Sequence, residues 1–336
     1  MMNFYKFMFF NAMISGTLLT ISTLSWLMAW IGLEINLMAI IPLMKMYNNK
    51  YSAEAMIKYF IVQAMASAIL LFTIVIFKNM QMYHQDLFKI SSILITSALL
   101  MKLGSAPFHS WFPEVISGLK WKSIILLTTW QKIAPMIILT YSTLNTSYLI
   151  ISILLSSMIS GFQGLNQTCL RKIMAYSSIN HVNWMICAIF NSFIIWTYYF
   201  LIYSLININI IFIFNKYKMY FLNQLNKLFS FNKNMKIMFM LNFLSLGGLP
   251  PFLGFLPKWM TVNYLIMSNM YFITFILIIM TLIPLFYYLR ITFTTFIINS
   301  EESMNFYSKN NKFMQSILNF IILFSLSICT IMSEMF

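Results

Sequence analysis

The sequence predicts an all-α protein, a polytopic transmembrane helix bundle with about eleven spans. Of its 336 residues 60% are hydrophobic and 8% are charged, and the mean hydropathy is +0.80, which leaves too little polar surface for a water-soluble domain of this size. The apolar runs reach about twenty residues, the length of helix that crosses a hydrocarbon core of about 30 Å. The period-two alternation of a transmembrane barrel is absent.

Polar and Gly/Pro-rich breaks divide the chain into eleven predicted helices. In order they cover residues 4–23, 26–45, 53–77, 87–116, 123–142, 147–164, 172–190, 193–214, 237–267, 270–297 and 314–334. The longest polar stretch between them, 215–236, is either an amphipathic segment on the membrane surface or a plain connector.

The cationic residues between these helices indicate the orientation, because cationic loops stay on the side from which a chain is inserted. If the N-terminus is inside, twelve Lys and Arg residues lie on the inner side and four on the outer side. The inner set is Lys6, Lys45, Lys50, Lys120, Lys122, Arg171, Lys172, Lys216, Lys218, Lys227, Lys233 and Lys236, and the outer set is Lys78, Lys89, Lys309 and Lys312.

Several classes of site are not expected. Cys169, Cys187 and Cys329 show no CxxC or Cys/His spacing, which argues against a disulfide framework, an iron–sulfur cluster or a zinc site. No GxGxxG or Walker sequence predicts a nucleotide site. The net charge of +14 is spread between the apolar runs instead of forming one basic patch, so nucleic acid is not an expected partner. We therefore expect no redox centre or cofactor in this chain.

Four ionisable residues lie near the middle of apolar segments: Glu34, Lys102, Lys132 and Lys258. An ionised group at the bilayer centre costs about 2.5 to 3.5 kcal/mol, so such groups usually face the bundle interior or a water-filled path. A buried pair of Glu34 with one lysine would fix helix packing, but it would leave two lysines without a central acid. Desolvation favours the neutral form of a lysine, and a carboxylate within about 4 to 6 Å favours the charged form. We interpret the set as a proton relay.

Two predicted helices are interrupted beside a lysine. Gly104 and Pro107 follow Lys102, and the stretch LSLGGLPPFLGFLPKW, residues 244–259, breaks before Lys258. Broken helices at membrane depth often surround ion sites, although a proline kink for packing explains either break alone. His109 and His181 are further relay candidates because imidazole titrates near neutral pH; the alternative for each is a packing residue. Arg290, late in its helix, is expected to reach an interface or a partner.

Six stretches carry a resemblance to a known family. They are WIGLEINLMAIIPL (30–43), KYFIVQAMAS (58–67), LLMKLGSAPFHSWFPEV (99–115), TTWQKIAP (128–135), GLNQTCLRKIMAYSSINHVNW (164–184) and NFLSLGGLPPFLGFLPKW (242–259). In this order they resemble the subunit 2 family of mitochondrial NADH:ubiquinone oxidoreductase, respiratory complex I. The similarity runs over about residues 25–295, and the last forty residues match only in hydropathy.

The resemblance implies an antiporter-like membrane-arm subunit in the eleven-helix animal form, within one transmembrane domain over 1–336. Inverted repeats are implied, a truncated first one over about 1–170 and a second over about 171–298, followed by a loop and C-terminal helix over about 299–336. The resemblance also implies residue roles. Glu34 would pair with Lys102, Lys132 would be the central relay lysine, Lys258 the lysine of the second broken helix, and His181 a histidine between the halves.

The implied function is proton translocation coupled to electron transfer from NADH to ubiquinone. NADH, FMN, iron–sulfur clusters and ubiquinone would then be bound elsewhere in the complex. The implied location is the mitochondrial inner membrane, with the N-terminus in the matrix and the C-terminus in the intermembrane space. Expected partners are other membrane-arm and accessory subunits and phospholipid, including cardiolipin, and no homo-oligomer is expected. Two alternatives stay open: a cation/proton antiporter subunit, and a structural spacer of the membrane arm.

Overall fold

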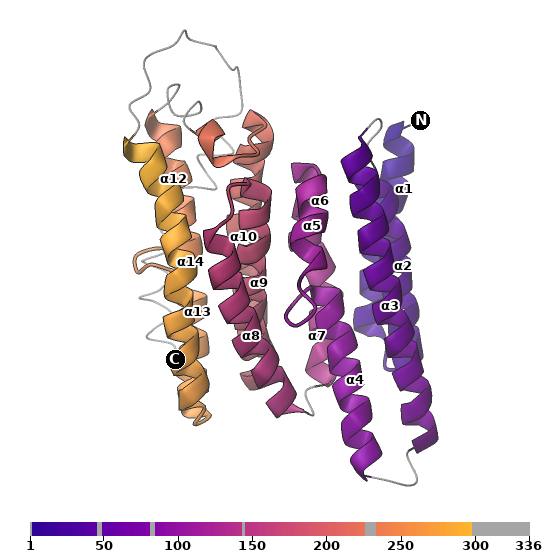
Figure 1. The fold of residues 1–336 in the computed structure, drawn as a ribbon. Helices are drawn as coiled ribbons and strands as arrows, with labels where there is room; N and C mark the ends of the chain where they lie inside the picture. Colours follow the sequence, from indigo (N-terminus) through magenta and orange to yellow (C-terminus); the bar gives the residue numbers. More distant parts are fainter. Residues whose placement is uncertain (1, 46–48, 81–84, 143–144, 226–232, 298–336) are drawn as a thin grey trace. The chain divides into compact units, whose positions relative to one another are not determined.

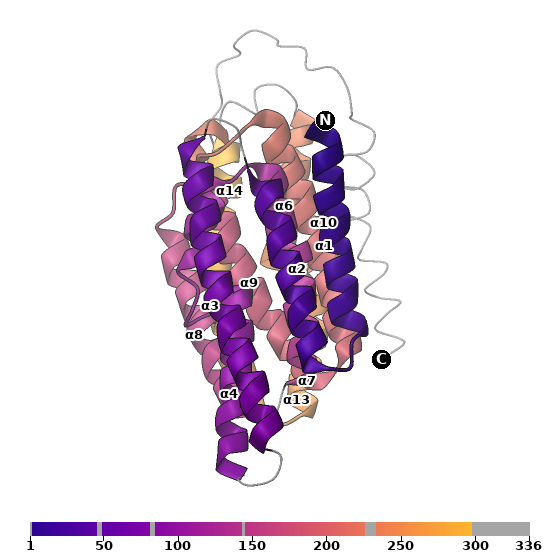
Figure 2. The ribbon, with the colours of Figure 1, turned by 90° about the vertical axis from the view of Figure 1, so that its right-hand side faces the viewer.

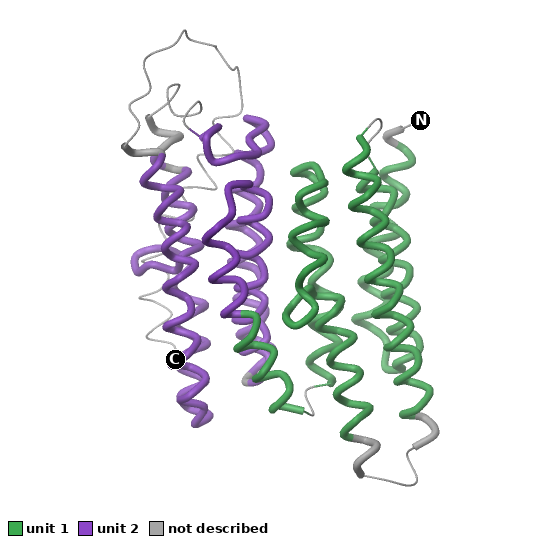
Figure 3. Tube along the Cα trace, in the orientation of Figure 1, with its two compact units in different colours: residues 1–156 green, residues 157–336 purple. Residues whose placement is uncertain are grey.

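The computed structural model describes residues 2–45, 49–80, 85–142, 145–225 and 233–297. In these ranges every regular element is a helix, apart from an isolated antiparallel bridge between Cys169 and Phe221. The described residues contain seven helical spans that are long and apolar enough to cross a membrane, and one of them, Trp121–Tyr141, consists of two consecutive helices. The predicted all-α membrane fold is therefore confirmed. The chain divides into two compact units, residues 1–156 and 157–336, each treated by itself below (Figure 3).

The first unit is built from helices that run along one another (Figures 1 and 2). They are α1 (Met2–Ser22), α2 (Trp26–Met44), α3 (Lys50–Met80), α4 (Gln85–Leu103), α5 (Trp111–Gly118), α6 (Trp121–Thr128) and α7 (Trp130–Tyr141), followed by α8 (Thr146–Leu165). Small residues bring α1 and α2 together, because a Cβ added to Gly32 would lie 2.6 Å from the Thr20 side chain and 3.0 Å from the Gly16 carbonyl. In lipid, where no hydrophobic force drives helices together, such close backbone packing is a main source of helix association.

The second unit contains a central helix that is unusually polar. Its elements after α8 are α9 (Leu170–Asn191), α10 (Phe193–Tyr217), the 3-10 turn η1 (Leu222–Gln224), α12 (Lys233–Gly247), α13 (Phe255–Met267) and α14 (Tyr271–Ile297). Every residue of α9 from Ile173 to Ile189 is buried, and α9 contacts α10, α13 and α14. A helix enclosed on all sides would normally be apolar all round, so the serines, asparagines and histidine within α9 require a specific explanation.

Each of the first ten predicted helices corresponds to one or two helices in the described residues, and the eleventh, 314–334, lies outside them. The predicted helix over 123–142 corresponds to one apolar span, Trp121–Tyr141, and the unpredicted feature is its interruption at Thr129, between α6 and α7. Thr128 and Thr129 donate their hydroxyls to the carbonyls of Ile124 and Ile125 at 2.9 and 2.7 Å. Side-chain bonds of this kind compete with the helical backbone and bend helices.

The predicted connector at 215–236 begins later than expected. Helix α10 continues to Tyr217 and ends at Lys218, whose φ of +52° is left-handed. The turn η1 follows at Leu222–Gln224. Residues 226–232 lie outside the described part of the chain, so an amphipathic surface segment remains a prediction.

Candidate functional site

The first broken helix places Lys102 at the end of α4, next to a turn that glycine makes possible. Gly104 has a φ of +73°. The Gly104 N–H donates to the Met101 carbonyl at 3.3 Å, and the Ser105 N–H donates to the Leu100 carbonyl at 3.1 Å. This pair of bonds is a Schellman cap, which satisfies carbonyls at the end of a helix and uses glycine in the left-handed position. The helix therefore ends one residue after Lys102.

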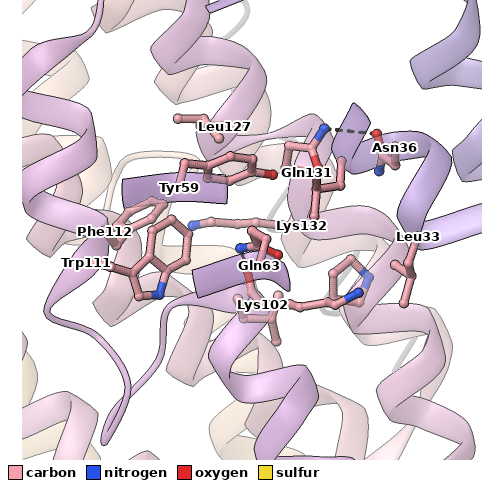
Figure 4. A pocket seen from close by; sticks show the side chains of 13 residues that line it. Leu33, Asn36, Tyr59, Gln63, Lys102, Trp111, Phe112, Leu127, Gln131 and Lys132 are labelled. Atoms are coloured by element: carbon pink, nitrogen blue, oxygen red, sulfur yellow. Dashed lines mark hydrogen bonds between the residues drawn. The ribbon is translucent and has the colours of Figure 1, made fainter. Parts of the chain in front are cut away.

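Lys102 and Lys132 line the same small cavity in the first unit (Figure 4). The cavity has a volume of about 20 Å³ available to water centres, which is enough for about one or two water molecules. Besides the two lysines, its polar lining comes from α2, α3 and α7: Asn36, Tyr59, Gln63 and Gln131. Two of the residues that the sequence singled out are thus brought together, on α4 and α7.

Lys102 is buried, with 7% of its surface exposed. The side chain of Gln63 on α3 donates to the Lys102 backbone carbonyl at 3.3 Å and so fixes the end of α4. Glu34 on α2 acts on the Lys102 amine electrostatically, but the two side chains form neither a hydrogen bond nor a direct ion pair. Glu34 is partly buried, and its Oε1 has no hydrogen-bond partner among the described residues. Glu34 therefore influences Lys102 through space without being locked to it.

Lys132, on α7, is 2% exposed. Its amine lies 5.6 Å from the centre of the Phe112 ring, within the range of a cation–π contact. Phe112 belongs to α5, the half-helix after the break, and Figure 4 shows the Lys132 side chain extending toward Phe112 and Trp111. The lysine of one helix thus touches the second half of the broken helix.

Amide side chains complete the cavity wall. Gln131, the residue before Lys132, donates to Asn36 on α2 at 2.9 Å (Figure 4). Asn36 is 2% exposed. The sequence analysis did not select Asn36, Gln63 or Gln131, although each is an amide within an apolar run. A rule that collects every uncharged polar residue in a predicted span would have found them, together with many that have no such role.

The second broken helix repeats the cap of the first. Gly248 has a φ of +75°, its N–H donates to the Ser245 carbonyl at 3.0 Å, and the Leu249 N–H donates to the Leu244 carbonyl at 3.4 Å. The bonds have the same sequence separations as those around Gly104. The lysine differs in position, because Lys102 precedes its break whereas Lys258 follows it, on α13. The Lys258 amine reaches back across the break and donates to the Gly247 carbonyl at 2.8 Å.

The two histidines have different surroundings. His181 lies on the central helix α9, is 5% exposed, and its Nδ1 shares a hydrogen bond of 3.0 Å with the Tyr199 hydroxyl on α10. His109 lies in the turn between α4 and α5, is partly buried, and does not line the cavity of Lys102 and Lys132. The structure therefore gives His181 a defined polar partner and leaves His109 outside the cavity.

Other charged groups have local roles. Arg290 on α14 donates to the Leu165 carbonyl at 2.7 Å and to the Gln167 carbonyl at 3.2 Å, so it caps the end of α8 within its own unit. Lys58 on α3 is exposed and pairs with Glu54 at 2.7 Å and with Glu114 of α5 at 2.9 Å. In the described residues no group of three His, Cys, Asp or Glu side chains is arranged to hold a metal ion.

Comparison with known proteins agrees with this architecture. The sequence profile described as "NADH:quinone oxidoreductase/Mrp antiporter, TM" matches residues 23–284. The chain belongs to this family. Within it, "NADH-ubiquinone oxidoreductase chain 2" of Anopheles gambiae is 47% identical over 307 residues, which cover 90% of this chain and 89% of that protein. The protein of the same name from Aedes aegypti is 46% identical over 329 residues, 96% of each chain.

Two solved structures share the fold. A chain of respiratory complex I from Thermus thermophilus superposes with a TM-score of 0.87 at 21% identity, over 96% of this chain and 78% of that one. A chain of the Mrp complex from Dietzia sp. superposes with a TM-score of 0.74 at 13% identity, over 83% of this chain and 58% of that one. At these identities the likeness concerns the fold.

Proposed function

We propose that the chain is a proton-translocating subunit of the membrane arm of respiratory complex I, in the mitochondrial inner membrane. The family membership and the chain 2 relatives support this assignment. The structural observation that carries it is the cavity in which Lys102 and Lys132 meet three amide side chains. A buried pair of amines beside a cavity with room for water is suited to holding and passing protons, because neutral lysine accepts a proton and charged lysine donates one.

In this proposal Glu34 sets the charge of Lys102. The carboxylate lies in electrostatic range but makes no direct ion pair, so a small movement of α2 or α4 changes the attraction between the two. Carrying one charge against ~150 mV takes about 3.5 kcal/mol at about 2.3 kcal/mol per 100 mV. Electron transfer elsewhere in the complex would supply this energy by moving Glu34 and Lys102 relative to each other.

The remaining relay residues are proposed in the order Lys132, His181 and Lys258. Lys132 would exchange protons with Lys102 through the water of their cavity, and Lys258 would serve the second unit. The position of His109, away from the cavity, gives it a smaller role. We propose that NADH, FMN, iron–sulfur clusters and ubiquinone are bound by other subunits, that the N-terminus faces the matrix and the C-terminus the intermembrane space, and that phospholipid, including cardiolipin, surrounds the chain.

The experiment is the substitution Lys132→Met in the assembled complex, with protons translocated per electron measured in vesicles during NADH oxidation. Methionine keeps the length and apolar stem of lysine but carries no proton. The expected result is a lower proton-to-electron ratio with normal assembly. Lys122→Met on the neighbouring helix α6 is the matched control, because Lys122 is exposed and its loss should leave the ratio unchanged.

The proton-to-electron ratio of the Lys132→Met variant, together with an assay of sodium/proton exchange, separates the alternatives. A structural spacer predicts that Lys132→Met assembles and pumps at the normal ratio, which would contradict the relay. A sodium antiporter predicts that reconstituted chain alone exchanges sodium for protons without NADH. The likeness to a chain of the Mrp complex concerns the fold and does not favour that alternative over pumping within complex I.

A further inference from the structure

The second unit contains a cluster of buried tyrosines that the relay described above does not use. Tyr199 and Tyr203 lie on α10, and Tyr287 and Tyr288 on α14. All four are at most 2% exposed, and they are called the tyrosine cluster here. The preceding residue of α14, Phe286, is 60% exposed. The helix thus turns an apolar ring outward and hydroxyl-bearing rings inward, the reverse of what packing alone favours.

The cluster reaches His181 directly. The Tyr199 hydroxyl shares the hydrogen bond of 3.0 Å with His181 Nδ1. The ring of Tyr203, one helical turn further along α10, lies with its centroid 4.9 Å from that of the His181 imidazole. His181 therefore lies at one end of a larger set of buried polar side chains.

Two serines of the central helix continue the cluster toward α14. The Ser177 and Ser178 hydroxyls donate to the carbonyls of Met174 and Ala175 at 2.8 and 2.7 Å. Because each hydroxyl proton is committed to a carbonyl, each oxygen is left to accept a hydrogen bond. The Tyr203 hydroxyl faces Ser178, and the Tyr288 hydroxyl faces Ser177. Hydroxyls from α9, α10 and α14 thus meet within one unit.

Several polar atoms in this group face other polar side chains but form no hydrogen bond of good geometry with them. Among the described residues, the Tyr287 and Tyr288 hydroxyls and both amide atoms of Asn207 make no hydrogen bond of good geometry. Asn207 is 1% exposed and lies one turn from Tyr203 on α10. A buried polar group without a hydrogen bond destabilises the fold, and internal water usually removes this cost by making about three hydrogen bonds. These atoms therefore mark a position suited to ordered water.

The cluster also reaches the second broken helix. The Tyr288 ring lies against Gly247, since a Cβ added to Gly247 would be 3.6 Å from it. The carbonyl of the same Gly247 accepts the hydrogen bond from the Lys258 amine at 2.8 Å. The tyrosine cluster thus lies between His181, which Tyr199 contacts through its hydroxyl, and Gly247, which Tyr288 contacts through its ring and whose carbonyl holds Lys258.

We propose that the tyrosine cluster, with Ser177, Ser178 and Asn207, binds internal water and conducts protons between His181 and Lys258. The inference rests on the proposed function and adds residues to it. In each transfer a tyrosine or water oxygen accepts a proton from one neighbour while its own O–H bond breaks toward the next. Ser177 and Ser178, whose protons are donated to backbone carbonyls, only accept hydrogen bonds and so position the tyrosines and the water. The bonds formed and broken are equal in number and no tyrosine becomes ionised, so the transfer needs only the proton that enters at one end and leaves at the other.

The experiment compares Tyr288→Phe and Tyr203→Phe with Tyr198→Phe in the assembled complex. Each substitution removes one hydroxyl and keeps the ring. Tyr198 neighbours Tyr199 on α10 but is 38% exposed, so it is the matched control. Protons translocated per electron are measured during NADH oxidation. Lys258→Met serves as the reference variant, because it gives the decrease in this ratio that is expected when proton transfer through the second unit is blocked. The expected result is that Tyr288→Phe and Tyr203→Phe each lower the proton-to-electron ratio as much as Lys258→Met does, while Tyr198→Phe leaves the ratio normal.

Two outcomes would contradict either the tyrosine-cluster proposal or the proposed function, and the two can be distinguished. If Lys258→Met lowers the ratio but Tyr288→Phe and Tyr203→Phe do not, the tyrosine cluster is a packing feature and the proposed function stands. If none of the three lowers it, the relay through the second unit is itself wrong. Should a tyrosine variant fail to assemble, Ser177→Ala removes the facing hydroxyl at little steric cost, and a normal ratio in that variant would equally contradict the hydroxyl chain.

Discussion

Replacing Gly248 by alanine is expected to displace Lys258. The backbone at Gly248 has a φ of +75°, and a residue with a Cβ pays about 1 to 2 kcal/mol for the left-handed conformation. The new Cβ would also lie 2.8, 2.9 and 3.0 Å from the Cδ, Nζ and Cε atoms of Lys258. The flexible lysine would move away, and the bond from its amine to the Gly247 carbonyl, now 2.8 Å, would break.

The size of this effect follows from the bond that is lost. A hydrogen bond made by a charged group is worth about 1.5 to 3 kcal/mol. The arrangement with Lys258 bound to Gly247 would therefore become roughly 10- to 100-fold less populated, at about 1.4 kcal/mol for each factor of ten. A density map of the variant complex that resolves side chains would measure the distance from the Lys258 Nζ to the Gly247 carbonyl. Thermal inactivation would measure the loss of stability caused by the left-handed backbone at residue 248.

Gly104→Ala is the matched control. Its φ of +73° gives the same backbone cost, but the new Cβ would meet Phe112 at 3.1 Å and Trp111 at 3.2 Å, not a lysine amine. Both variants should lose similar thermal stability, and Lys258 should move in the Gly248 variant alone. The reasoning is refuted if Gly248→Ala retains a Lys258 amine within hydrogen-bond distance of the Gly247 carbonyl.

Three further predictions concern hydrogen bonds and ion pairs. Arg290→Ala should lower the thermal stability of the chain in the complex by about 3 to 6 kcal/mol, because two bonds from a charged donor to the end of α8 are lost, and Arg290→Lys should recover part of this in the same melting assay. Gln131→Leu should cost about 1 to 3 kcal/mol, because the buried amide of Asn36 loses its donor; a melting temperature equal to that of the unaltered complex would contradict this. Lys58→Met should leave the melting temperature nearly unchanged, because solvent screens its ion pairs with Glu54 and Glu114, and a clear loss by thermal denaturation would indicate that a partner subunit covers them.

The sequence predicts best where the chain must interrupt a helix. Lys102 and Lys258 were selected as charges within apolar runs. Gly104 and Gly248 then predicted the interruptions, and left-handed glycines at these two positions end α4 and α12 in the structure. The interruption at Thr129 was missed because two hydroxyl-bearing residues leave a weaker signal than glycine and proline do. Local chemistry of this kind can be predicted without knowing how the helices pack.

The composition of the cavity could not be predicted in the same way. Apolar residues of a membrane helix face lipid and protein alike, so hydrophobic periodicity does not tell which side chains point inward. Nothing local to Gln63 or Asn36 indicates that one meets the end of α4 and the other meets Gln131. Arg290 shows the same limit, because its target lies on a helix more than a hundred residues earlier. His109, chosen for its chemistry, lies in the turn outside the cavity.

The contact between Lys132 and the Phe112 ring makes a position in the protein depend on a charge. A ring quadrupole attracts an ammonium group by about 0.5 to 2 kcal/mol and has no comparable attraction for a neutral amine. In the proposed relay, Lys132 without its proton would no longer attract the Phe112 ring of α5. Movement of α5 away from Lys132 would in turn remove the same stabilisation from the charged amine, because such coupling is reciprocal. The Phe112 ring would thus couple the protonation of the Lys132 amine to the position of α5, in both directions.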